Sequence, residues 1–216
     1  VLNIDNLKTG KKYHLKDHKN LKNIICSIED TNLMKSVFED FKPDFVVHTA
    51  ASYNEPNNWI LDVKTNCIGG CNLIQESVKH KIKKFIYFQT SLCYGNNPKE
   101  SPISLNHSIN PEVNSYAITK TLAENYLKMS GLNFVCFRLA NVIGPRNLTG
   151  PLPIFYKRLK AKQNCFVTKS RRDFVFVKDL VEIVIESLQS QKAKGFYHFS
   201  CGKDISIIEL YNEVAK

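Results

Sequence analysis

Up to residue 140, short apolar segments alternate with longer amphipathic ones. Five segments of strand length are almost continuously apolar, as is typical of parallel strands covered on both faces: 1–5, 23–26, 44–50, 84–90 and 134–139. Between them, apolar residues recur at helical spacing over 31–41, 59–80 and 112–130. This order predicts an α/β fold with a doubly wound, parallel, Rossmann-like sheet and right-handed crossovers.

The pattern changes after residue 140, where glycines and prolines interrupt an irregular stretch. It then predicts a helix near 152–162, strands at 165–170, 173–177 and 197–200, a helix from Asp179 and a last helix at 205–215. We therefore predict two parts: the Rossmann-like sheet domain over 1–140, and mainly a small substrate-binding lobe over 141–216.

The composition is that of a globular protein, with 43% hydrophobic and 23% charged residues among 216. No apolar run approaches the ~20 residues that cross a bilayer, and no secretion signal is visible, so we expect no membrane partner. The seven cysteines are scattered, without a CxxC pair. We expect them to be small buried residues in the reducing cytoplasm, and we expect no metal site.

A formal net charge of +10 allows a nucleic-acid-binding surface as one interpretation. Most of that charge is lysine spread singly along the chain, and arginine is confined to 138–172. We therefore expect a solvated lysine surface and no nucleic-acid partner. Such a field would still attract a small anionic substrate.

The segment NSYAITKTLAEN, at 114–125, holds the main candidate chemistry. Tyr116 and Lys120 are four residues apart, which places them on one face of a helix. A free tyrosine titrates near ~10, and a nearby ammonium favours its phenolate form. The strand 84–90 delivers Thr90 at its carboxyl end, where parallel sheets bind ligands. An exposed helix pair and a hydroxyl that ties down a turn are the alternative interpretations.

The first strand ends in Asp5. An acidic residue at the end of the second strand of a Rossmann fold accepts hydrogen bonds from the adenosine ribose and repels a 2′-phosphate. This position favours NAD over NADP, although aspartate is also common in turns.

Seven segments together resemble the extended short-chain dehydrogenase/reductases, in particular the NAD-dependent nucleotide-sugar epimerases and dehydratases. They follow the order and spacing of that family over nearly the whole chain. The segments FQTSLCYG and RLANVIGPRN are most similar to those of epimerase-like enzymes of lipopolysaccharide O-antigen synthesis. The segments are DNLKTG (5–10), VVHTAAS (46–52), TNCIGG (65–70), FIYFQTSLCYG (85–95), YAITK (116–120), FRLANVIGPR (137–146) and RRDFVFVKDL (171–180).

The resemblance implies a role for each matching position. Tyr116 would be the catalytic base, Lys120 would hold the nicotinamide ribose, and Thr90 would be the hydroxyl partner. Asn141 would contact the substrate, and Arg172 would clamp its diphosphate unless it pairs with Asp179 instead. Besides Tyr116 and Lys120, the implied NAD-binding residues are Asp5, Asn6, Gly10, Ile28, Ala50, Ala51 and Thr65, with Asn66 bracing the strands.

Three departures from the family pattern matter. The chain starts at what should be the second strand, without the family's first strand and glycine-rich turn, and it stops short of the usual C-terminus. We therefore expect a truncated chain with an incomplete NAD site. Ser27 replaces the usual acidic residue after the third strand. Ser91, Leu92 and Cys93 stand where dehydratases of the family carry acidic residues.

These residues favour NAD-dependent epimerisation of a nucleotide-linked sugar through a keto intermediate. The alternatives are a nucleotide-sugar dehydrogenase or reductase, a 4,6-dehydratase and, outside enzymes, a dinucleotide-binding sensor. By the same resemblance we expect a UDP-linked substrate and a homodimer.

Overall fold

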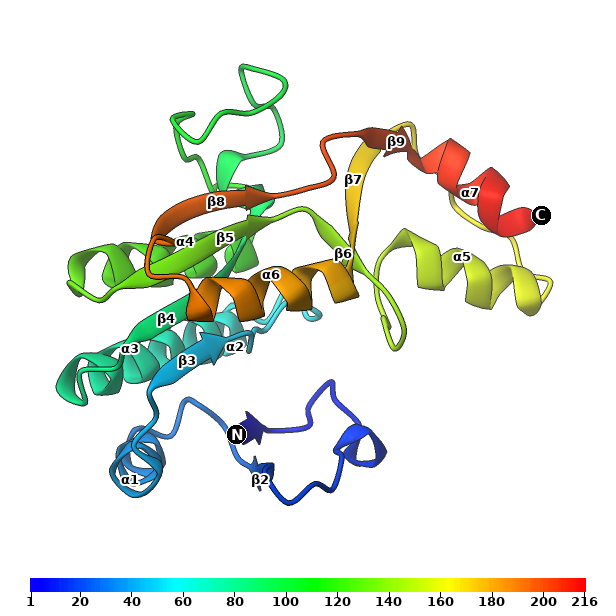
Figure 1. Cartoon of the computed structure of the whole chain (residues 1–216). Helices are drawn as coiled ribbons and strands as arrows, with labels where there is room; N and C mark the ends of the chain where they lie inside the picture. The colour runs from blue at the N-terminus through cyan, green and yellow to red at the C-terminus, as the bar shows by residue number, and fades with distance from the viewer.

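Four parallel strands form the central sheet of the computed structural model, which describes all residues from Val1 to Lys216. Most residues of its two middle strands, β4 and β5, are buried, which explains their nearly continuous apolar sequences. The predicted α/β fold with a parallel sheet is confirmed (Figure 1). In hydrogen-bonded order, the strands are β3 (Phe45–His48), β4 (Lys84–Thr90), β5 (Phe134–Leu139) and β8 (Gly195–Phe199).

Helices cover both faces of this sheet (Figure 1). Alternate residues of β4 belong to two separate apolar clusters: Phe85 and Tyr87 to one, Ile86 to the other. The sheet therefore divides the core into two layers, as the doubly wound arrangement requires. The first cluster involves α1 (Thr31–Phe41), α3 (Gly70–Lys79) and α4 (Ser115–Met129), and the second involves α6 (Val177–Gln189).

The helix predicted over 59–80 is continuous but not uniform. It consists of α2 (Trp59–Asp62), a π-helical segment at Val63–Gly69, and α3. A side chain at Gly69 would lie only 2.5 Å from Cγ1 of Ile28, so this close approach requires glycine. π-helical turns are often found at functional sites, and this one buries Thr65 and Asn66.

The N-terminal strands form a parallel pair of their own. β1 (Leu2–Asp5) pairs with β2 (Lys22–Ile25), and neither pairs with the four-stranded sheet. A short 3₁₀ helix, Lys12–His14, lies between them in sequence. Apolar side chains of both strands pack against the cluster around α1 and α3, which fixes the pair beside the sheet.

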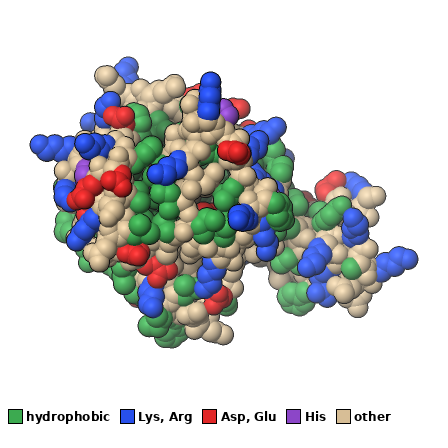
Figure 2. All heavy atoms as spheres, turned by 90° about the horizontal axis from the view of Figure 1, so that it is seen from below, with side chains coloured by type: hydrophobic (Ala, Val, Ile, Leu, Met, Phe, Trp, Pro, Cys, Tyr) green, Lys and Arg blue, Asp and Glu red, His purple; other side chains and the backbone are tan.

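A smaller lobe follows the central sheet. Its strands β6 (Asn141–Ile143), β7 (Arg171–Phe176) and β9 (Asp204–Ser206) form a mixed three-stranded sheet. Helices α5 (Pro151–Lys160) and α7 (Ile207–Ala215) pack together around the buried side chains of Phe155, Ile207 and Leu210. Figure 2 shows this part as a smaller mass beside the main body.

Not all of the segment 141–216 belongs to this lobe, because α6 and β8 pack on or pair with the central sheet. The strand predicted at 165–170 is wrong: the segment is irregular, and Phe166 is 87% exposed. β6 and β9 were not predicted, because three residues are too few to show an alternating pattern.

Lys84, at the start of β4, ties the sheet to α6. Its buried ammonium donates hydrogen bonds to the carbonyl oxygens of Ser187, at 2.7 Å, and of Ser190, at the C-terminal end of that helix. Last-turn carbonyls lack partners inside a helix, and a cation there also balances the helix dipole.

We predict that Lys84→Met lowers the free energy of unfolding by about 1–3 kcal/mol, because the buried carbonyls lose their donor. Chemical denaturation measures the change, with exposed Lys35→Met on α1 as the matched control. Equal stability of the two variants would contradict the assignment.

Candidate active site

The candidate catalytic residues lie where β4 ends and α4 begins. Asn114 caps α4 by accepting a hydrogen bond from the Ala117 backbone N–H at 2.8 Å, so the helix starts at Ser115. Tyr116 therefore stands in the first turn and Lys120 one turn later on the same side. Thr90 is the last residue of β4.

A cavity of about 510 Å³ brings these three side chains together. Thr90, Tyr116 and Lys120 all line it, as does Asn141. Its remaining wall comes largely from residues 142–153 and β7, so the cavity lies between the carboxyl edge of the sheet and the lobe. No aspartate or glutamate lines it, and its cationic residues are Lys120 and Arg146.

The Thr90 hydroxyl is oriented by its surroundings. Its Oγ1 accepts a hydrogen bond from the Leu92 backbone N–H at 3.2 Å. The backbone N–H of Thr90 donates to Oε1 of Gln89 at 2.8 Å. That hydrogen bond uses only a lone pair of Oγ1, so the hydroxyl proton can still be donated to a partner in the cavity.

Tyr116 is a weak acid in this structure. Burial raises its pKa to about 12, the nearby Tyr53 phenol and Asp62 add to the rise, and the Thr90 side chain works against it. The lowering by Lys120 that we expected from the sequence is not found. Within the chain alone, the cost of burying a phenolate outweighs the other effects.

Lys120 is also held away from its charged form. Burial lowers its pKa to about 7, while Cys136 works in the opposite direction. Its ammonium lies 4.2 Å from the centre of the Tyr87 ring, and no carboxylate forms an ion pair with it. His48 lies in the same region, and burial, followed by the charge of Lys120, lowers its pKa to about 3.

A second cavity, of about 310 Å³, adjoins the first and lies over the N-terminal strand pair. The two cavities share Thr49, Ala51 and Tyr53 as lining residues. Gly10, which was also predicted to bind the cofactor, does not line the second cavity. It lies next to Asp5: a side chain at this position would come within 3.2 Å of Oδ2 of Asp5. Six residues predicted to bind the cofactor do line the second cavity: Asp5, Asn6, Ile28, Ala50, Ala51 and Thr65.

The residues of both cavities fit the two ends of NAD. Oδ1 of Asp5 accepts a hydrogen bond from the Leu7 N–H at 2.7 Å, which leaves Oδ2 able to accept from a ribose hydroxyl. Ile28 offers an apolar surface to an adenine ring. In the first cavity, the polar side chains of Tyr116 and Lys120 offer hydrogen-bonding groups that suit ribose hydroxyls.

Glu29 stands two residues beyond Ser27 but does not take the place of the acidic residue that the family usually carries there. Its carboxylate accepts hydrogen bonds from the Ser27 hydroxyl at 3.0 Å and the Thr65 hydroxyl at 3.4 Å. Glu29 itself does not line the second cavity. It braces Thr65, which does.

Asn66 connects the two sides of the site. Its side chain accepts from the Ser52 N–H at 2.8 Å and donates to the Ser52 carbonyl and to Oγ1 of Thr119, both at 3.0 Å. Thr119 precedes Lys120 on α4, and Ser52 follows β3. Asn66 therefore fixes the loop after β3 against the catalytic helix.

The two residues predicted to bind the substrate differ in position. Asn141 lines the first cavity, and its amide donates to the Asp173 carbonyl at 3.0 Å. Arg172 lies on an exposed part of β7 and does not line the cavity. The alternative salt bridge to Asp179 is not formed, and the guanidinium donates to the Arg171 carbonyl at 2.8 Å.

Several residues of the site were missed at the level of sequence. Tyr53 lines both cavities, and its ring centre lies 6.2 Å from that of Tyr116. Asp62 is buried and accepts the Ser52 hydroxyl at 2.7 Å. Their only sequence signal is closeness to the VVHTAAS and TNCIGG segments, which gives no indication of orientation.

Two other findings concern possible ligands and surroundings. No group of three or more histidine, cysteine, aspartate or glutamate side chains is arranged to hold a metal ion. None of the helices combines the length and apolar character needed to cross a bilayer.

The parallel sheet is of the Rossmann-like, dinucleotide-binding type, and two adjoining cavities lie at its carboxyl edge, one of them lined by Thr90, Tyr116 and Lys120. A family model for the NAD-dependent epimerase/dehydratase family matches residues 1–202. The chain therefore belongs to that family, and the resemblance inferred from the sequence is confirmed.

Known proteins similar to this chain perform more than one reaction. The WbmH enzyme of Bordetella bronchiseptica, solved with NAD⁺, is 52% identical, with a TM-score of 0.94 over 98% of this chain and 70% of its own. UDP-glucose 4-epimerase of Thermotoga maritima, solved with UDP-glucose, is 29% identical, with a TM-score of 0.90 over 99% and 72%. The dTDP-D-glucose 4,6-dehydratase of Dictyostelium discoideum is 26% identical over 87% of this chain, which spans about half (48%) of that relative.

We predict that Lys120 makes stability depend on pH. Its pKa is about 7 in the folded chain and about 10.4 in an unfolded one. Between these two pH values the unfolded state binds one more proton than the folded state. The free energy of unfolding therefore rises as pH rises and decreases as pH falls toward 7, by at most ~1.4 kcal/mol per pH unit.

Denaturation of the wild type and of Lys120→Met at pH values of about 7.5, 8.5 and 9.5, which lie between the two pKa values, measures the effect. The variant should be relatively most stable at the lowest pH and lose that advantage as pH rises. Lys35→Met is the control for removing an exposed lysine. Parallel pH curves for the wild type and Lys120→Met would contradict the prediction.

Proposed function

We propose that this protein is an NAD-dependent nucleotide-sugar epimerase. The observation that carries the proposal is the single cavity lined by Thr90, Tyr116 and Lys120, which adjoins a second cavity suited to adenosine. Family membership supports the use of NAD and of a nucleotide-linked sugar. The solved relative with UDP-glucose favours a UDP-linked substrate.

Each side chain has a distinct proposed task. Tyr116 takes a proton from a sugar hydroxyl and later returns it, which is general base and then general acid work. Thr90 donates its free hydroxyl proton to the same sugar oxygen and orients it. Lys120 holds the ribose beside Tyr116. NAD would supply the acceptance and return of a hydride, and the positive charge of its oxidised ring would favour the Tyr116 phenolate.

Epimerisation is preferred over dehydration because of what the cavity lacks. Expelling water from a sugar needs a further acid–base group for the leaving hydroxyl. Ser91, Leu92 and Cys93 follow Thr90, and no carboxylate lines the cavity. Epimerisation needs only reversible oxidation at one carbon, after which the keto-sugar turns over before the hydride returns.

The remainder of the substrate is assigned by position. Asn141 lines the cavity and can contact the part of the substrate near its phosphates. Arg172 lies further along β7, where a guanidinium can reach a diphosphate that extends out of the cavity. The link to lipopolysaccharide O-antigen synthesis rests on the resemblance of the FQTSLCYG and GPRN segments, and the cytoplasmic location rests on the cysteine pattern.

A homodimer is the proposed assembly. Ile118, Leu122 and Tyr126 follow one another at four-residue intervals along α4, and all three are exposed. Ile60 and Val63, on the neighbouring helix, extend this apolar face. Two copies that joined through these helices would bury it, and the interface would lie behind the catalytic helix.

We predict that Tyr116→Phe lowers kcat by about 10²–10⁴-fold, the usual effect of a positioned acid–base group, and leaves the fold intact. Chromatography of UDP-linked hexoses incubated with NAD measures the epimers formed, and circular dichroism checks the fold. Tyr13→Phe, at an exposed tyrosine, is the matched control.

The same assay separates the alternatives. An epimerase regenerates NAD and gives no net absorbance of reduced nicotinamide, whereas a dehydrogenase or reductase would change it in proportion to product. A keto-sugar lacking water would indicate a dehydratase. Binding of NAD without conversion of any sugar would favour the sensor. Full turnover by Tyr116→Phe would reject the assignment of the base.

We predict that Leu122→Glu converts a dimer to a monomer, because a charge at the centre of an apolar interface raises the dissociation constant by roughly tenfold or more. Light scattering after size-exclusion chromatography measures the mass. Val181→Glu, at an exposed apolar position on α6, should stay dimeric. A monomeric wild type at micromolar concentration would reject the dimer.

A further inference from the structure

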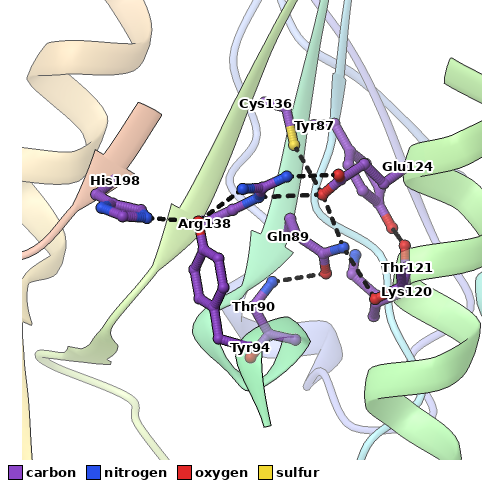
Figure 3. A network of polar contacts seen from close by, with 10 residues as sticks. All are labelled: Tyr87, Gln89, Thr90, Tyr94, Lys120, Thr121, Glu124, Cys136, Arg138 and His198. Carbon is purple, nitrogen blue, oxygen red and sulfur yellow. Dashed lines mark hydrogen bonds and ion pairs between the residues drawn. The ribbon is translucent and has the colours of Figure 1, made fainter. Parts of the chain in front are cut away.

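A buried ion pair lies directly behind the candidate active site (Figure 3). Glu124 stands one turn after Lys120 on α4 and is fully buried. Arg138 comes from the otherwise apolar strand β5 and is 5% exposed. Its Nη2 lies 2.7 Å from Oε1 of Glu124, and its Nε donates to Oε2 at 3.3 Å. Both oxygens of the carboxylate are therefore engaged by one guanidinium.

Gln89 connects this pair to Thr90. Gln89 and Arg138 are register partners on β4 and β5, so both side chains leave the sheet on the face that α4 covers. Nε2 of Gln89 donates to Oε2 of Glu124 at 3.1 Å, and its Oε1 accepts the Thr90 backbone N–H at 2.8 Å. Nε2 also donates to Oγ1 of Thr121 at 3.5 Å. The orientation of the amide is fixed, because a flipped amide would set its NH₂ against the Thr90 N–H.

The other end of the network reaches β8. Nη1 of Arg138 donates to the Tyr94 hydroxyl at 2.6 Å, and that hydroxyl lies 2.6 Å from Nε2 of His198. Burial lowers the pKa of His198, and Arg138 adds to this effect, so the neutral imidazole accepts the Tyr94 proton. Three strands and α4 are joined through one chain of hydrogen bonds (Figure 3).

We infer that Gln89 and Glu124 are positioning residues for the proposed reaction: they set the place of Thr90 relative to Tyr116 and Lys120. Glu124 belongs to the helix that carries Tyr116 and Lys120, and Gln89 holds the backbone of Thr90. The network is thus a polar connection between the helix and the strand that supply the two halves of the site, in addition to the hydrogen bond that the Tyr87 hydroxyl donates to the Lys120 carbonyl at 2.9 Å. This inference rests on the proposed epimerase function.

Stability alone is a weak explanation for this arrangement. A buried ion pair often adds little to stability compared with apolar side chains of the same size, because both charges lose their water. The neighbouring core is apolar and could have continued across these positions. What apolar residues could not do is accept the Thr90 N–H and fix its direction.

The test is a double-mutant cycle between Gln89 and Thr90. Gln89→Met keeps the size of the side chain but loses its hydrogen bonds to Glu124, Thr121 and the Thr90 N–H. We expect it to lower kcat roughly 10- to 100-fold, as small misplacements of a catalytic group do, with KM for the sugar nearly unchanged. In the Thr90→Ala background, the same change should alter kcat by less than about twofold, because Gln89 acts through Thr90.

Two controls separate positioning from folding. Lys84→Met removes a buried polar side chain at the other end of the same strand, so it should lower stability but leave kcat unchanged. Should Gln89→Met fail to fold, Glu124→Gln is used in its place, because it keeps the shape and gives up one acceptor oxygen. Its effect on kcat should likewise vanish in the Thr90→Ala background.

The outcomes distinguish this inference from the function on which it rests. A wild type that epimerises no sugar would overturn both. An active wild type with equally active Gln89→Met would overturn the inference alone. So would independent effects of the two substitutions, multiplying in the double variant, because a merely structural role predicts that result.

Discussion

Helix α4 brings two ionisable side chains, Lys120 and Glu124, into the interior one turn apart, and the site depends on how their charges are balanced. Both are at most 1% exposed. A buried charge either finds partners or changes its protonation state. Glu124 is satisfied by the guanidinium of Arg138. Lys120 has no such partner, and burial lowers its pKa to about 7.

This difference keeps Lys120 available to the cavity. Residues four apart on a helix are neighbours, so Glu124 is the natural ion-pair partner of Lys120. Arg138 and Gln89 occupy both of its oxygens and hold them on the strand side of the helix. Lys120 is left against the Tyr87 ring and along the cavity wall. The ion pair therefore prevents the carboxylate from neutralising the lysine.

The sequence predicts the central fold well because its strongest elements are long and apolar. β4 and β5 begin and end at the predicted residues, and α1 does as well. The lobe is predicted less well. The apolar residues within 165–170 predicted a strand, but the Phe166 side chain is exposed. Apolar character shows what can be buried, and only tertiary contacts decide whether it is.

The same limit applies to the site. Tyr116, Lys120 and Thr90 were found because spacing on one helix and the end of one strand are local properties. The contacts of Glu124 with Arg138 and Gln89 were not, although a lone arginine in FVCFRL already requires a buried partner. That partner depends on the pairing of β4 with β5, which no local pattern contains.

Strand register and catalytic geometry are therefore coupled. Gln89 opposes Arg138, and Thr90 opposes Leu139. A slip of one residue would turn Arg138 to the opposite face, among the apolar side chains of Ile86 and Leu180 and away from Glu124. The ion pair with Glu124 penalises that slip. The interaction that favours this register of β5 with β4 is thus part of the same network that we infer positions Thr90 opposite α4.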